Sequence, residues 1–324
     1  MSDELNAEKS IKKYEAMVEK LAFAAVTEQR KKRLWRTFWI FLTFLYLTPL
    51  VIATLNLDEN TFFSVAESTD KHTAKVTMSG VIMPDSPAGA ESIIKGLQKA
   101  FENEKTAGVV LEINSPGGSP VQSAYIYDEI RRLKSEHENI NLFAVVEDVA
   151  ASGGYFVASA ADKIFVNKSS MVGSIGVRMD NFGAVDLIKK LGIERRLLTA
   201  GKHKGLLDPF LPVDEDQANY IKSMLKDVHQ NFITAVREGR GDRLKEKEYP
   251  NLFTGLVWSG EKAVEMGLVD NFGTTASVAR DIIKAEDMVD YTSKKLFMER
   301  LAERVGASIV SSIRAIIGFD QIME

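Results

Sequence analysis

The stretch Ala144–Ala161 contains the serine that is best placed for nucleophilic chemistry. An apolar run ends at residue 151, Ser152-Gly153-Gly154 follows, and a second run of small apolar residues suits a buried helix. This pattern predicts a strand, a tight turn and a helix, with Ser152 at the turn. Its hydroxyl would then lie beside N–H groups that lack helical partners and attract negative charge. Ser is also a preferred N-cap, so the local sequence leaves two roles open for Ser152, nucleophile and helix cap.

A second glycine turn follows the preceding strand of the chain. Residues 115–118 read Ser-Pro-Gly-Gly, and glycines expose their N–H groups without an obstructing side chain. In a parallel βαβ unit both turns lie at the same edge of the sheet. We therefore expect the N–H groups of Gly118 and Gly153 to face one point, as an oxyanion hole requires.

The composition excludes several other kinds of chemistry. The 324 residues include no Cys, which excludes disulfides, Cys-based zinc sites and thiol nucleophiles. The four His residues include no pair at the i, i+4 spacing of a helical metal site, and nothing in the sequence indicates a metal or organic cofactor. A net charge of -4 gives no electrostatic footprint for nucleic acid.

Residues 37–55 form an uncharged stretch near the N-terminus, 19 residues long. At about 1.5 Å per residue, a helix of this length approaches the roughly 30 Å of a bilayer core. Five cations precede it, between Arg30 and Arg36, which places the N-terminus in the cytoplasm by the positive-inside rule. A cleaved signal peptide and a buried core helix are the alternatives, but the stretch is long and Ala53-Thr54-Leu55 is a poor cleavage site. The sequence therefore predicts a single-pass anchor in the lipid bilayer.

Strands alternate with helices in the body of the chain. The predicted strands are residues 74–83, 108–113, 141–146, 163–166 and 194–198, and the predicted helices are 90–102, 121–133, 182–191, 214–238, 259–266 and 275–283. Such alternation predicts an α/β fold with largely parallel pairing. For the longest helix, Asp214 with Gln217 three residues later predicts the N-cap, and Gly239 the end.

These patterns divide the chain into five parts. They are a charged, helical, cytoplasmic segment (1–33), the transmembrane anchor (34–55), a polar linker (56–73), the α/β domain (74–285) and a helical tail (286–324). The tail is too short and too charged for a second span. It packs on a neighbouring subunit or lies on the membrane surface, and the sequence leaves both alternatives open.

Six segments of the body, taken in order, resemble a known family. They are VLEINSPGGS (110–119), YDEIRRLK (127–134), AASGGYFVASAADKI (150–164), VGSIGV (172–177), GKHK (201–204) and VWSGEKAVEMGLVD (257–270). Together they resemble the protease IV, or signal peptide peptidase A, family and its SohB-like relatives, which are membrane-anchored serine peptidases. The resemblance implies a Clp protease/crotonase-like fold of mostly parallel sheets with flanking helices. It also implies that residues 74–285 are a serine peptidase domain.

The resemblance further implies a Ser–Lys dyad, in which Ser152 is the nucleophile and Lys204 the general base. A serine hydroxyl needs a base, and no His occurs in the fifty residues after Ser152. Lysine acts as a base only when neutral, which burial or nearby positive charge favours. His203 stands where the family more often has Tyr and is the alternative base. Ser174 matches a hydroxyl that hydrogen-bonds the lysine in similar enzymes.

The implied activity is that of an endopeptidase for hydrophobic peptides such as released signal peptides. Its catalytic domain would lie on the periplasmic side of a bacterial inner membrane. Full-length family members carry Ser and Lys on two related halves, whereas this chain holds one half's worth of body. We therefore expect a ring-shaped homo-oligomer in which Ser152 of one subunit meets Lys204 of its neighbour. A crotonase-like acyl-CoA enzyme and a non-catalytic, peptide-binding membrane scaffold are the alternative functions.

Overall fold

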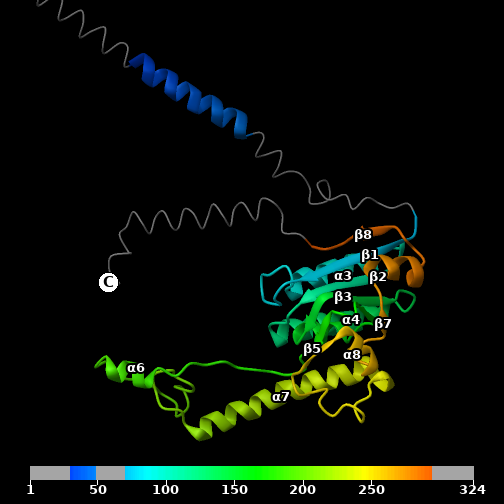
Figure 1. Cartoon of the computed structure of the whole chain (residues 1–324). Helices are drawn as coiled ribbons and strands as arrows, with labels where there is room; N and C mark the ends of the chain where they lie inside the picture. Colours follow the sequence, from blue (N-terminus) through cyan, green and yellow to red (C-terminus); the bar gives the residue numbers. More distant parts are fainter. Residues whose placement is uncertain (1–29, 49–69, 294–324) are drawn as a thin grey trace, which may run out of the picture. The chain divides into compact units, whose positions relative to one another are not determined.

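The structure is a computed structural model that describes residues 30–48 and 70–293. Residues 30–48 form one helix (Figure 1). Among the described residues, no helix is both long enough and apolar enough to cross a membrane. The second part of the predicted span, residues 49–55, lies outside the described residues, as do most of the predicted cytoplasmic segment, most of the linker and the tail from residue 294 on.

The body is built on an eight-stranded sheet with the order β6-β5-β3-β2-β1-β8, in which β4 pairs with β3 and with β7 (Figure 1). The strands are β1 (His72–Ser79), β2 (Thr106–Ser115), β3 (Leu142–Ala151), β4 (Lys163–Val166), β5 (Met171–Gly173), β6 (Val257–Ser259), β7 (Asn271–Phe272) and β8 (Met288–Asp290). Every pairing is parallel except that of β5 with β6. The predicted α/β class with largely parallel pairing is therefore confirmed.

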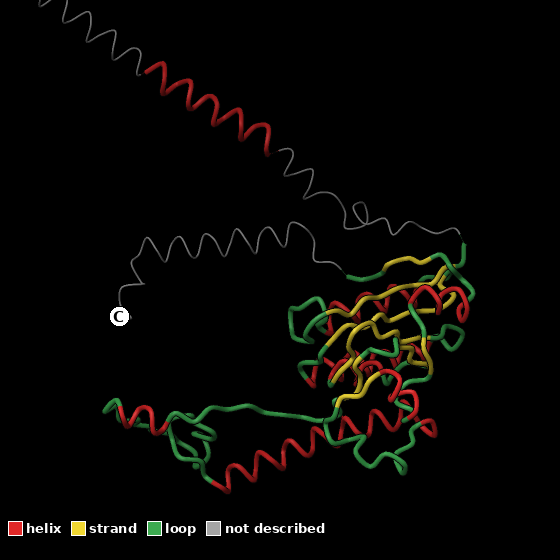
Figure 2. Tube along the Cα trace, viewed as in Figure 1, coloured by secondary structure: helices red, strands yellow, loops and turns green. Residues whose placement is uncertain are grey.

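Helices alternate with these strands along the chain. They are α3 (Ala90–Glu102), α4 (Pro120–Glu136), α5 (Gly153–Ala158), α6 (Val185–Lys190), α7 (Glu215–Arg240), α8 (Gly260–Glu265) and α9 (Thr275–Ser277), with a 3-10 turn η1 (Gly241–Arg243) and a π turn η2 (Val278–Ile283). Figure 2 shows helices and strands interleaved in the body and α7 running out of it. The predicted bounds of α3 are those observed.

The central strands are apolar on both faces because both faces are covered. Alternate side chains of β2, such as Leu111 and Ile113, join the main core beneath α3 and α4, whereas Val110 joins a second cluster with Phe143 and Val278 on the opposite face. All three β2 side chains are fully buried. Burial on two faces explains why these strands read as near-continuous apolar runs rather than as alternating ones.

The longest helix, α7, shows one prediction confirmed and one wrong. The Asp214 side chain accepts from the N–H of Gln217 at 3.0 Å, as the N-cap prediction requires. The helix then runs past Gly239 and ends at Arg240, with Gly241 (φ +53°) as its C-cap. A Cβ at Gly239 would lie 1.9 Å from the carbonyl oxygen of Ser159. Gly239 therefore permits close packing between α7 and the end of α5 and does not terminate the helix.

The predicted strand at residues 194–198 is not present. These residues belong to the segment 177–214 between β5 and α7, which we call the arm (Figure 1). The arm is folded by contacts within itself, such as the bond from Ala184 N to Pro209 O (2.7 Å) and the ion pair of Arg195 with Asp208 (2.9 Å). It offers no neighbouring strand for residues 194–198 to pair with, and α6 within it is shorter than the predicted helix 182–191.

Strand β8 lies beyond residue 285, where the sequence placed the end of the α/β domain. Its residues 288–290 pair with β1, and Tyr291 stacks on His72 with ring centroids 5.9 Å apart. The Tyr291 hydroxyl also lies 3.0 Å from Nε2 of His72. The sheet therefore includes the first residues that the sequence assigned to the tail.

Candidate active site

Ser152 lies in a strained turn between β3 and α5. Its φ and ψ are +52° and -123°, a conformation that costs a non-glycine residue about 1–3 kcal/mol and that clusters at functional sites. Its N–H donates to Gly173 O at 2.8 Å and its carbonyl accepts from Phe156 N at 2.9 Å, so both sides of the turn are fixed. Within the described residues the Ser152 hydroxyl makes no helix-capping hydrogen bond. The cap alternative is therefore not supported, and the hydroxyl stays available for other chemistry.

The main chain of Gly118 lies next to that of Gly153. The bonds from Ile82 N to Gly117 O (2.9 Å) and from Ser119 N to Ile82 O (2.8 Å) fix the turn that contains Gly118. A Cβ placed on Gly153 would lie 3.4 Å from the nitrogen of Gly118. Neither of these two N–H groups has an acceptor among the described residues, and that of Gly153 is the first of a helix, where no helical acceptor exists. Two adjacent free donors beside a serine suit an oxyanion hole.

The glycines in both turns are required by close approach. Gly117 has a φ of +99°, and a Cβ on it would lie 2.8 Å from the nitrogen of Gly153. A Cβ on Gly153 would lie 2.3 Å from Oγ of the buried Ser123. The two turns therefore come together only because neither position carries a side chain.

Ser174 follows β5 at the same edge of the sheet as Ser152. Gly173 is the register partner of Ala151, and it accepts the N–H of Ser152, so Ser174 lies at the neighbouring strand end. Ser174 has a φ of +51°, and its N–H donates to Leu256 O at 2.7 Å. The structure thus brings Ser174 to the turn of Ser152, where the resemblance expects a supporting hydroxyl.

Lys204 is not brought to this turn. It is exposed in the arm, in a turn where its N–H donates to Gly201 O at 3.1 Å, and His203 beside it is exposed as well. In the part of the chain that the structure describes, the Lys204 side chain makes no hydrogen bond or ion pair. One chain therefore assembles Ser152, the two glycine N–H groups and Ser174, but neither of the predicted bases.

His229 touches the site from α7, and no sequence motif singles it out. Its Nε2 lies 3.0 Å from Ile175 O, one residue beyond Ser174. The side chain lies between the apolar stripe of α7 and its exposed face, next to Val228. A polar residue at the margin of an apolar stripe is the one signal in the sequence, and it does not identify what the residue contacts.

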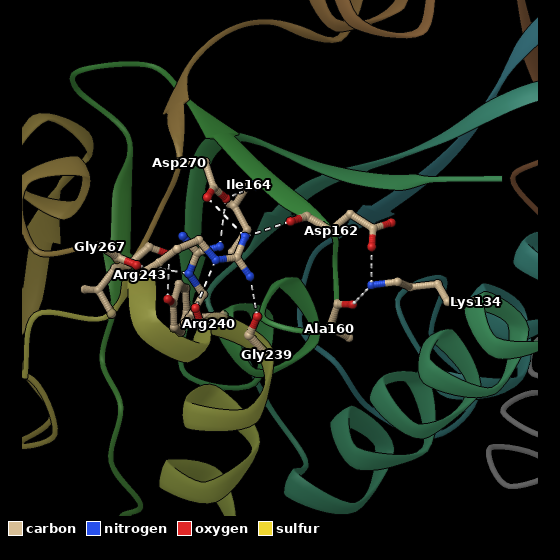
Figure 3. A network of polar contacts seen from close by, with 11 residues as sticks. Lys134, Ala160, Asp162, Ile164, Gly239, Arg240, Arg243, Gly267 and Asp270 are labelled. Atoms are coloured by element: carbon tan, nitrogen blue, oxygen red, sulfur yellow. Dashed lines mark hydrogen bonds and ion pairs between the residues drawn. The ribbon is translucent and has the colours of Figure 1, made fainter. Parts of the chain in front are cut away.

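A polar network at the amino ends of β4 and β7 anchors the C-terminal end of α7 (Figure 3). The buried Arg240 donates to Gly267 O at 3.0 Å and to Oδ2 of Asp270 at 2.7 Å. Arg243 donates to Oδ1 of Asp270 at 3.1 Å and to Asp162 O at 2.8 Å. Gly267 and Asp270 precede β7, and Asp162 precedes β4 and bonds Leu142 at the start of β3. The network therefore ties the end of α7 to the amino ends of these strands, at the edge of the sheet opposite to Ser152.

The Asp270 carboxylate is the centre of this network. It also accepts from Ile164 N at 2.7 Å. Burial acts to raise the pKa of Asp270, but the hydrogen bonds and positive charges of Arg240 and Arg243 outweigh it and hold the pKa below its ordinary value. Asp270 is therefore a structural carboxylate, ionised at neutral pH.

No metal centre is found among residues 30–48 and 70–293, where no three His, Asp or Glu side chains gather as ligands. The polar groups that do gather near Ser152 are hydroxyls and main-chain N–H groups. Such a set suits acyl transfer through a serine ester.

Sequence profiles of two known families match this chain. The profile of peptidase family S49 matches residues 134–289, and that of Clp protease matches residues 69–172. Ser152 lies in both matched regions. The Clp protease match accords with the mostly parallel sheet described above.

The most informative relatives differ in how much of their length is matched. A Na+/H+ antiporter NhaA of Brucella melitensis is 46% identical over 184 residues, which are 57% of this chain and 25% of the antiporter. A Methanocaldococcus jannaschii protein named as a candidate protease is 32% identical over 225 residues, 69% of this chain and 70% of its own. An Enterococcus faecium protein named as a candidate signal peptide peptidase SppA is 26% identical over 274 residues, 79% of this chain and 78% of its own.

The match to the antiporter covers only a small part of that protein. The chain spans about a quarter of that relative, so the name describes a protein most of which is not matched. The two relatives with protease names are matched over more than two thirds of their length. The similarity to proteases therefore covers the body that holds Ser152.

Proposed function

The chain belongs to peptidase family S49, a family of serine proteases, and we propose that it is a membrane-anchored serine endopeptidase with Ser152 as nucleophile and Lys204 as general base. The observation that most strongly supports Ser152 as the nucleophile is its surroundings. Ser152 has a strained main chain, an uncommitted hydroxyl and two free N–H groups beside it, those of Gly118 and Gly153. A helix cap needs none of the three, whereas acyl transfer uses all of them.

The proposed reaction runs through an acyl-enzyme. Oγ of Ser152 attacks the scissile carbonyl carbon while Lys204 takes the hydroxyl proton, and the carbonyl oxygen becomes an oxyanion that accepts from Gly118 N and Gly153 N. Collapse of this intermediate breaks the C–N bond, and Lys204 returns the proton to the leaving amine. Lys204 then takes a proton from water as the water attacks the ester, and it returns this proton to Oγ of Ser152 as the acid leaves, which regenerates the free serine and the neutral lysine.

We propose that Lys204 reaches Ser152 from a neighbouring subunit of a ring. The arm that carries Lys204 exposes much apolar surface in the single chain: Phe182, Leu198 and Val213 are 85%, 96% and 76% exposed. Exposed apolar surface on this scale is typical of an interaction site. Cover from a neighbour would also remove water from Lys204, which favours the neutral amine that a base needs. A closed ring repeats the same contact at every subunit.

The proposed substrates are hydrophobic peptides such as released signal peptides, cleaved near the bilayer on the periplasmic side of a bacterial inner membrane. The SppA relative, named for signal peptides, supports this substrate class. The uncharged residues 37–55 and the cations before them support the anchor and its orientation. The tail would pack on a neighbouring subunit or lie on the membrane surface.

Cleavage of a synthetic signal peptide by the detergent-solubilised full chain tests this proposal. Mass spectrometry should find products cut within the hydrophobic segment, and these should be lost with Ser152→Ala and with Lys204→Ala. His203→Ala is the matched control, since it removes the neighbouring cation and the alternative base. Cleavage by folded Lys204→Ala at the wild-type rate would overturn the dyad, and loss in His203→Ala alone would transfer the role of base to His203.

A further inference from the structure

Three segments hold the turn that follows β5. Gly173 O accepts from Ser152 N at 2.8 Å, and Ser174 N donates to Leu256 O at 2.7 Å. The carbonyl oxygen of Ile175, the residue after Ser174, lies 3.0 Å from Nε2 of His229 on α7. Residues 173–175 are therefore each bonded to a different segment. Gly173 is bonded to Ser152 after β3, Ser174 to the segment before β6, and Ile175 to α7.

This turn stores backbone strain next to the strained Ser152. The φ values are +100° at Gly173 and +51° at Ser174, against +52° at Ser152. Glycine adopts such a φ freely, but Ser174 and Ser152 persist in these conformations only where their surroundings hold them there. Ile175 is fully buried, main chain included, so its carbonyl has little access to water and depends on a protein donor. His229 is the donor that the structure provides.

His229 lies near the point where α7 meets the body. From Phe232 onward the helix is packed: the rings of Phe232 and Phe156 are 4.9 Å apart, and the Tyr127 hydroxyl donates to Ala235 O at 3.2 Å. Towards the arm, Tyr220 is 67% exposed. His229 thus precedes the packed part of α7 by three residues, about one turn of the helix.

We propose that His229 is a positioning residue for Ser152. Its Nε2–H donates to the Ile175 carbonyl and so stabilises the Gly173–Ile175 turn. This turn then fixes the main chain of Ser152, through the bond from Ser152 N to Gly173 O, and the position of Ser174. Because the acceptor is a carbonyl oxygen, Nε2 carries the proton, as it does in the imidazolium ion and in one neutral tautomer. The role rests on the proposed function of Ser152, and it links the site to the helix whose other end carries the arm of Lys204.

Two near-isosteric variants separate hydrogen-bond donation from packing. His229→Gln keeps an N–H donor at about the same reach, whereas His229→Glu replaces it with a carboxylate that faces the Ile175 carbonyl. If the loss of this hydrogen bond acts fully on the transition state, it lowers the rate constant about tenfold. We expect His229→Glu to lower kcat of peptide cleavage about tenfold with KM little changed, and His229→Gln to stay within about threefold of wild type. Gln230→Glu, on the exposed neighbour, should change neither.

For each full-length variant we would measure kcat, KM, Tm and the rate of labelling by a fluorophosphonate probe. Wild-type kcat and labelling in folded His229→Glu, or an equal loss in His229→Gln and His229→Glu, would overturn the positioning role. If His229→Glu does not fold, His229→Leu takes its place as the variant without a donor. Ser152→Ala is measured in parallel as a separate test of the nucleophile. If it is labelled at the wild-type rate, the assignment of Ser152 is overturned independently of the role of His229.

Discussion

At the scale of single residues, the site depends on two glycines that allow two turns to touch. Gly117 and Gly153 lie where any side chain would meet main chain or the Ser123 hydroxyl. The sequence predicted the pair of turns from the two Gly-Gly motifs and the strands before them. It could not predict the contact with Ser123, because that contact depends on how α4 packs over α5.

Gly153→Ala should therefore abolish peptide cleavage and lower the free energy of unfolding. The new methyl would lie 2.3 Å from Oγ of Ser123, and such overpacking costs about 1–3 kcal/mol. The double variant Gly153→Ala/Ser123→Ala removes the clashing oxygen. Urea unfolding should show it less destabilised, relative to Ser123→Ala, than Gly153→Ala is relative to wild type. Equal costs in the two backgrounds would contradict the contact.

At the scale of elements, α7 connects the arm to the site and is anchored by the Asp270 network. The sequence predicted its start because an N-cap is a local signal, but Gly239 was misread as a terminator because its role depends on the distant Ser159. The strands β5 and β6 were missed, since three residues are too few for a period to be recognised. These short strands nevertheless carry Gly173 and the segment that binds Ser174.

Asp270→Asn should destabilise the body at neutral pH and change its response to acid. The pKa of Asp270 is held below its ordinary value, so its stabilisation is present above the unfolded pKa of about 3.9 and is lost as the pH falls through the folded pKa. Breaking one side of a buried ion pair costs about 3–5 kcal/mol. Urea unfolding at pH 7 and at pH 3 should therefore show a smaller difference between wild type and variant at pH 3. A difference that is the same at both values would contradict the role of the carboxylate.

At the scale of the whole molecule, the described part of one chain shows a body that holds Ser152 with two N–H groups beside it, and an arm with exposed apolar surface. The resemblance, rather than any periodicity, led to Lys204, because a lysine in a glycine-rich loop has no local signature of a base. The strand predicted at 194–198 failed for a related reason, since the arm has no sheet beside it. In both cases the deciding neighbours are far away in sequence or, in the proposed ring, belong to another subunit.

Mixing two inactive variants tests whether sites are shared between subunits. Ser152→Ala and Lys204→Ala chains, refolded or co-expressed in equal amounts, should regain activity because intact Ser152 and intact Lys204 meet at some interfaces. Random placement in a ring restores about a quarter of the sites. Each variant alone serves as the control, and mixed rings are verified with two different affinity tags. No recovery in verified mixed rings would contradict the shared site.

The nucleophile is tested most directly by locating the adduct of a fluorophosphonate probe on the full chain. After digestion, mass spectrometry should find the phosphonyl group on the peptide that contains Ser152, and on no peptide of Ser152→Ala. Ser169→Ala, which removes an exposed hydroxyl elsewhere, should label as wild type does. An adduct on another residue, or equal labelling of wild type and Ser152→Ala, would contradict the account.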